Sequence, residues 1–163
     1  MKTKVPFINL KFSDTGENVL VNYQDVRTVT ITPHEQSGAK VRLSTSVENI
    51  DFSVTDHTRD RMREELSSRY NLANISPAGV TFKLTRNPAT SLTAFVISTG
   101  EESRSQIIVL PRGLKGLTVS DDELTIGVVS KSSSRDGVRV QFAAPLSADQ
   151  IEELIKAADG ARI

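Results

Sequence analysis

The stretch from Ile107 to Pro145 constrains the fold of this chain more than any other part of the sequence. It reads IIVLPRGLKGLTVSDDELTIGVVSKSSSRDGVRVQFAAP, in which short aliphatic and β-branched runs alternate with turn residues. Leu124, Ile126 and Val128 share one face of a strand, because successive side chains of a strand point to opposite sides. Short runs of this kind, bounded by Gly, Ser and Asp, predict antiparallel strands joined by tight turns.

Similar segments occur throughout the chain. Val26–Thr32 is rich in β-branched residues. Val41–Leu43 and Ile50–Val54 alternate between apolar and polar positions, as expected for a small sheet with one solvent-exposed face. Leu92–Ser98 and Ile107–Leu110 are apolar on both faces. We therefore expect these last two segments to lie at the centre of a sheet.

Two helices are predicted. The first covers residues 57–70, with Thr55 or Asp56 as its N-cap and with Met62, Leu66 and Tyr70 at one-turn spacing. The segment that follows it, residues 71–79, contains Pro77 and Gly79 and is expected to be a connector.

The second helix covers residues 148–159 and carries the clearest local signals in the chain. Ser147 and Gln150 have the spacing of a capping box, and Leu146 is placed to pack against Ile151. Its expected apolar stripe consists of four residues: Ile151, Leu154, Ile155 and Ala158.

The pattern predicts an α+β fold, mainly antiparallel β, built from two similar small β-sheet halves that are each closed by a C-terminal helix. The expected boundaries are residues 1–75 and 76–163. Both halves contain a β-branched strand, a polar loop and a Val-Arg pair, Val41-Arg42 in the first and Val138-Arg139 in the second. An internal duplication explains this similarity, and chance likeness between β-hairpins is the open alternative.

Composition narrows the function classes. The chain has no cysteine, which excludes disulfides and thiolate chemistry, and it has 20 basic and 20 acidic residues, so no global charge attracts nucleic acid or membrane. Equal numbers of acidic and basic residues still allow a local basic patch on the surface. No apolar run approaches the length of a membrane span, and no early signal peptide is apparent. We expect a cytoplasmic protein without membrane contact.

Catalytic patterns are missing from the sequence. His34 and His57 are the only histidines, and neither belongs to a motif for nucleophilic catalysis, phosphate binding or zinc binding. A hydrolase that uses His57 with Asp60 is the weakest alternative that we retain. We therefore expect a protein that is not an enzyme, with no metal, no cofactor and no small-molecule substrate.

Residues 107–156 resemble the carbon storage regulator family, small bacterial proteins that bind messenger RNA. IIVLPRG is similar to the first strand of the family, LTVSDDELTIGVV to its second and third strands, GVRVQFAAP to its fourth strand, and SADQIEELIKAA to its C-terminal helix. The resemblance covers about a third of the chain. It implies a post-transcriptional regulator that binds single-stranded RNA through strand edges.

The chain also departs from this family. Pro111 stands where a second basic residue is usual, and the fifth strand of the family has no counterpart between Pro145 and Ser147. Family members are shorter and form interlocked homodimers, so a duplicated chain would correspond to a fused pseudo-dimer.

The basic residues of this region are the candidate RNA contacts: Arg104, Arg112, Lys115 and Arg139. Arg112 and Lys115 flank Gly113, where the backbone is expected to approach a phosphate closely. The alternative function is a protein–protein interaction or assembly module, with a phage or viral structural role included, in which sheet edges or helices join copies of the chain or bind another protein.

Overall fold

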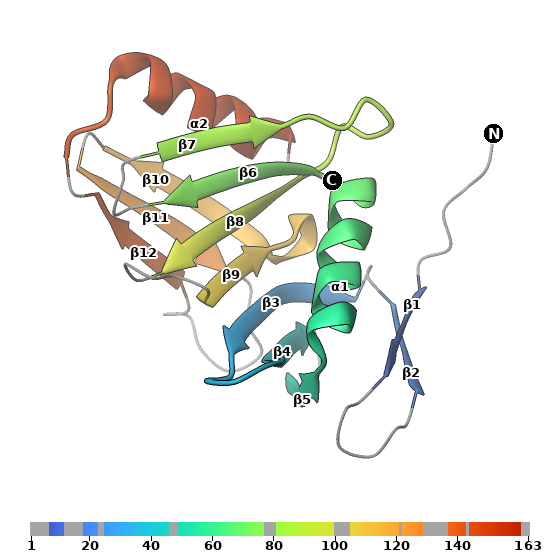
Figure 1. Cartoon of the computed structure of the whole chain (residues 1–163). Helices are drawn as coiled ribbons and strands as arrows, with labels where there is room; N and C mark the ends of the chain where they lie inside the picture. The colour runs from blue at the N-terminus through green and yellow to red at the C-terminus, as the bar shows by residue number, and fades with distance from the viewer. Residues whose placement is uncertain are drawn as a thin grey trace.

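The computed structural model describes residues 7–11, 18–22, 25–45, 49–76, 81–99, 105–120, 122–128, 137–142 and 144–160. Within these residues the fold is mixed α+β and consists mostly of strands, with two α-helices and three sheets (Figure 1). The predicted fold class is confirmed at this level. None of the helices in the described ranges is both long and apolar enough to cross a membrane.

The largest sheet has seven strands in the order β5-β4-β3-β9-β8-β6-β7. All neighbours in it are antiparallel except β6 and β8, which are parallel. Its strands are β3 (Val26–Pro33), β4 (Ala39–Thr45), β5 (Asn49–Val54), β6 (Asn71–Ser76), β7 (Thr81–Thr85), β8 (Thr93–Thr99) and β9 (Ser105–Val109).

The remaining elements form two smaller antiparallel sheets, two helices and one short 3-10 turn. The sheets are β1 (Phe7–Lys11) with β2 (Asn18–Asn22), and β10 (Leu114–Val119), β11 (Glu123–Val128) and β12 (Gly137–Gln141) in that order. The other elements are α1 (Asp56–Arg69), η1 (Pro111–Gly113) and α2 (Ala148–Gly160).

Helix α1 covers one face of the large sheet. Thr55 is its N-cap and accepts a hydrogen bond from the Thr58 backbone N–H at 3.2 Å, so the cap is Thr55 rather than Asp56. Met62 and Leu66 are buried in one hydrophobic cluster with residues from β3, β4, β5, β8 and β9. The predicted one-turn spacing of this helix is therefore confirmed.

The other face of the same sheet is covered by β10–β12 and α2. In Figure 1 these strands lie behind the β6–β9 part of the large sheet and α2 runs along the top. Phe95 and Ile97 of β8 pack here with Leu124 and Ile126 of β11 and with Leu154 of α2. Strand β8 is apolar on both faces because it lies between these two clusters, as the sequence predicts.

The capping box of α2 is confirmed by both of its hydrogen bonds. The Gln150 backbone N–H donates to Ser147 Oγ at 3.2 Å, and the Ser147 backbone N–H donates to Gln150 Oε1 at 2.9 Å. Among its described side chains, Leu154 and Ala157 are buried and Ile151 is partly buried, while the side chain of Ala158 lies outside the description. Ile155 was expected in this stripe and instead is 48% exposed, because the inward face follows the 151, 154, 157 positions.

The expectation of two similar halves, each closed by its own helix, is not confirmed. The expected boundary between residues 75 and 76 falls within β6, and β3 pairs with β9, so strands from both sides of the boundary share one sheet. The physical reason is that backbone N–H and C=O groups of a buried strand need partners along both edges, and β3 and β8 provide them for β9.

The prediction of a connector at residues 71–79 is wrong for its first part, because Asn71–Ser76 forms strand β6. Ala73 and Ile75 point into the core beneath α2. The polar side chains of this strand bond to residues that are distant in sequence. The Asn71 side-chain amide donates to the Leu92 carbonyl, and that of Asn74 donates to the Lys83 carbonyl. Asparagine side chains of this kind are usual in turns, which explains the wrong prediction.

Candidate binding surface on the three-stranded sheet

The sheet β10–β12 has one buried face and one exposed face. Leu124 and Ile126 of β11 and Val140 of β12 are buried against the large sheet. Because side chains alternate along a strand, the residues between them point outward. The outward residues within the described ranges are Gly116, Thr118, Glu123, Thr125, Gly127, Gly137, Arg139 and Gln141.

Three glycines form a row across this outer face. Gly127 of β11 is the register partner of Gly116 on β10 and of Gly137 on β12. A Cβ atom added at Gly116 would meet no heavy atom within 4 Å, so the space above it is open. Neighbouring strands lie about 4.8 Å apart, which makes the row a strip of bare backbone about 10 Å across.

The next row of the sheet borders this strip with polar groups. Thr125 is the register partner of Thr118 on one side and of Arg139 on the other. Arg139 Nε lies 3.2 Å from Glu123 Oε1, and the Arg139 side chain is 74% exposed. An ion pair as exposed as this contributes only about 0–1 kcal/mol, so a competing anion can displace Glu123 at little cost.

Of the other predicted RNA contacts, Arg112 is exposed on η1, directly before β10. The backbone of Lys115 belongs to β10, but its side chain lies outside the description, and so does the whole of Arg104. Arg112 therefore precedes one edge strand of the sheet, while Arg139 lies on the opposite edge strand. The structure does not bring these two arginines into contact.

The expected role of Gly113 is wrong. Gly113 is buried, and a Cβ atom at this position would meet the backbone oxygen of Arg27 in β3. The close approach that requires glycine is therefore made to the chain's own strand rather than to a phosphate. Sequence reasoning also missed the glycine row, because only Gly127 lies inside a segment that the sequence clearly predicts as a strand, and the register that aligns Gly116 and Gly137 with it appears only in the structure.

The histidines do not form a catalytic arrangement in the described ranges. His34 Nε2 lies 3.3 Å from Ser53 Oγ at an exposed position, and His57 is exposed in the first turn of α1. Asp60, the suggested partner of His57, instead accepts a hydrogen bond from Arg59. Across the described part of the chain, no group of three or more His, Asp or Glu side chains is placed to hold a metal ion.

Comparisons with known proteins give no match to a family model, to a curated protein or to a solved structure.

Proposed function

We propose that this chain is a non-catalytic RNA-binding protein whose outer β10–β12 face holds single-stranded RNA. The observation that carries the proposal is the glycine row beside Arg139. Glycine inside a strand marks a bulge or a close approach; β10 shifts register between Leu114 and Gly116, and nothing obstructs the space above Gly116. A nucleotide can lie against this strip at van der Waals distance.

The groups that border the strip supply the polar contacts for such a ligand. The hydroxyls of Thr118 and Thr125 can donate to or accept from ribose and phosphate, and a guanidinium binds phosphate through two parallel hydrogen bonds. The described outer face carries no large apolar side chain, whereas the centre of a protein–protein interface is usually apolar or aromatic. This difference favours a polar partner for this face.

The resemblance to the carbon storage regulator family extends the proposal to a role in translational regulation in the cytoplasm. We also propose that the two halves of the chain arose by internal duplication, although their strands share one sheet. Binding here relies on backbone, hydroxyl and guanidinium contacts, because the described outer face carries no aromatic side chain for base stacking.

The test measures binding of a fluorescent single-stranded RNA pool by anisotropy over a series of salt concentrations. Each phosphate contacted by a cation contributes a slope of about −0.7 to the dependence of log K on log salt. Arg139→Ala should weaken binding and make this slope less steep by about 0.7. Arg42→Ala is the matched control, since Arg42 forms a similar exposed cross-strand pair with Asp51 on the large sheet.

A second variant tests the strip itself. Gly116→Val adds a branched side chain where there is open space, so the sheet should tolerate it while RNA loses its contact with the backbone. Unchanged RNA binding by both Gly116→Val and Arg139→Ala would contradict the proposal.

Assembly with further copies or with another protein is the second candidate, and the exposed Ile155 on α2 favours it. Light scattering over a wide concentration range should then show a defined oligomer that Ile155→Glu dissociates. A constant monomeric mass, together with no protein partner in pull-down experiments, would exclude this candidate.

A further inference from the structure

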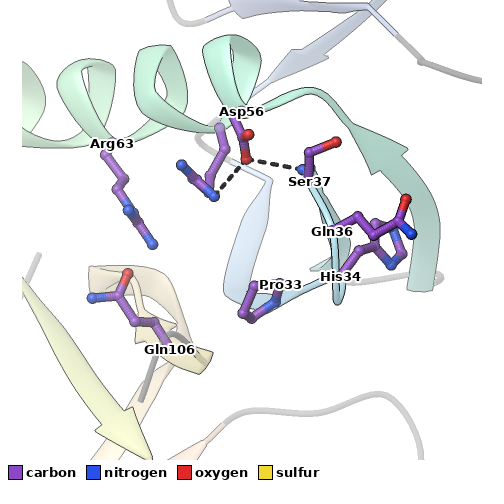
Figure 2. A pocket seen from close by; sticks show the side chains of 9 residues that line it. Pro33, His34, Gln36, Ser37, Asp56, Arg63 and Gln106 are labelled. Carbon is purple, nitrogen blue, oxygen red and sulfur yellow. Dashed lines mark hydrogen bonds and ion pairs between the residues drawn. The ribbon is translucent and has the colours of Figure 1, made fainter. Parts of the chain in front are cut away.

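A polar hollow of about 410 Å³ lies between the β3–β4 turn and the first half of α1 (Figure 2). His34, Gln36 and Gly38 line it from the turn, Asp56 and Arg63 from α1, and Gln106 from β9. Its size falls within the range of small-molecule sites, which is roughly 300–1,000 Å³. Its lining is polar, so it suits a polar or charged ligand.

The acidic groups of this region are already engaged. Asp56 Oδ1 accepts hydrogen bonds from the Gly38 backbone N–H at 2.9 Å and from Arg59 Nη1 at 2.8 Å. Asp60 accepts from the same arginine, at 3.3 Å from its Nη2. Arg59 is therefore neutralised by two carboxylates, and Asp56 also fixes the β3–β4 turn against the helix.

Arg63 is the second arginine that lines the hollow, and the ion pairs of Asp56 and Asp60 are made with Arg59 rather than with it. In Figure 2 its side chain extends from α1 toward Gln106 across the hollow. Its Nε is buried and has no hydrogen-bond partner in the described part of the chain. Burial, and then the charge of Arg59, lower the pKa of Arg63, while Asp60 acts in the opposite direction.

We propose that this hollow binds a small molecule bearing an oxyanion, with its phosphate or carboxylate group held by the Arg63 guanidinium. The planar guanidinium matches both kinds of group through two parallel hydrogen bonds. The side-chain amides of Gln36 and Gln106 and the imidazole of His34 line the remaining space and provide contacts for the rest of the ligand. The site is separate from the glycine row, so it does not depend on RNA binding.

The test uses the full chain with inorganic phosphate and with malonate as probes, each compared with chloride at equal ionic strength. At a probe concentration ten times its Kd, the midpoint of thermal unfolding should rise by about 4 °C. The relative effect of phosphate and malonate identifies the preferred group. Arg63→Met should weaken binding about tenfold or more, because it removes a charge-assisted pair.

Arg61→Met is the matched control, since Arg61 is an exposed arginine on the same helix that does not line the hollow. It should bind the probes like the unchanged protein. Arg63→Lys keeps the positive charge but lacks the planar guanidinium group, so this variant should bind the probes with intermediate affinity.

The Nε–H signal of Arg63 in nitrogen-edited NMR spectra gives a readout that is independent of stability, and it should shift on addition of the preferred probe. Equal thermal shifts for phosphate, malonate and chloride would overturn the proposal. So would an Arg63 Nε–H signal that already reports a carboxylate partner in anion-free buffer. That result would mean that the chain supplies its own anion.

Discussion

Replacing Gly113 by alanine should destabilise the protein severely, although it adds only one methyl group. The Cβ atom would lie 2.2 Å from the backbone oxygen of Arg27 and 2.8 Å from its carbonyl carbon. Ordinary contacts begin near 3.4 Å, so η1 and β3 would have to separate by roughly 1 Å. No side-chain rotation relieves this contact, because both atoms of Arg27 belong to the backbone.

The size of the effect follows from the contacts that this separation disrupts. The Leu110 backbone N–H donates to the Arg27 carbonyl at 2.9 Å, and this bond connects η1 to β3. Overpacking costs about 1–3 kcal/mol and the loss of one such hydrogen bond about 1 kcal/mol. We therefore expect Gly113→Ala to lower the free energy of unfolding by about 2–4 kcal/mol.

Urea denaturation followed by circular dichroism measures this quantity, and Gly116→Ala is the matched control. Gly116 is three residues away, and a Cβ atom there meets nothing within 4 Å. That variant should be neutral or more stable by up to about 1 kcal/mol, because alanine restricts the unfolded chain. Equal stability of the two variants would refute the packing of η1 against β3.

Three further predictions concern single contacts. Ser147→Ala removes the side-chain half of the capping box with Gln150 and should lower the free energy of unfolding by about 1 kcal/mol, measured by urea denaturation; no change would mean that the cap is not formed. Leu66→Ala should cost about 2–5 kcal/mol in the same assay because Leu66 is only 2% exposed, and a cost below 1 kcal/mol would contradict the packing of α1 on the sheet. The hydrogen bond from Arg42 holds the pKa of Asp51 below its ordinary value. The stability from this pair is therefore fully present at a pH above the ordinary pKa of an aspartate, and it is lost as the pH falls through the lowered pKa of Asp51. Arg42→Met should raise the Asp51 pKa toward its ordinary value in an NMR titration, and an unchanged pKa would show that the pair does not form in solution.

Local signals in the sequence predict local structure well in this chain. The capping box of α2 depends on Ser147 and Gln150, which are three residues apart, and both of its hydrogen bonds form as predicted. The central position of β8 and β9 also follows from their own residues, since a strand that is apolar on both faces must be covered on both faces.

Arrangements that depend on distant pairing could not be predicted in the same way. Nothing in Val26–Pro33 identifies Ser105–Val109 as its neighbour, because either strand can pair with any edge of suitable pattern. The glycine row requires the register of three strands, and the hollow near Arg63 requires the packing of α1 against the β3–β4 turn. Asn71 and Asn74 make β6 hard to recognise in the sequence, because the carbonyl groups that accept their side-chain hydrogen bonds lie 21 and 9 residues away along the chain.

The pairing of β3 with β9 has a consequence for biosynthesis. Thr28 and Val109 are register partners although roughly 80 residues separate them. One edge of β3 therefore stays unpaired until β9 has been synthesised and most of the chain has left the ribosome. Closing so long a loop is entropically unfavourable and slows folding. A nascent chain that stops before residue 105 therefore exposes an apolar strand edge, which is a substrate for chaperones and a starting point for aggregation.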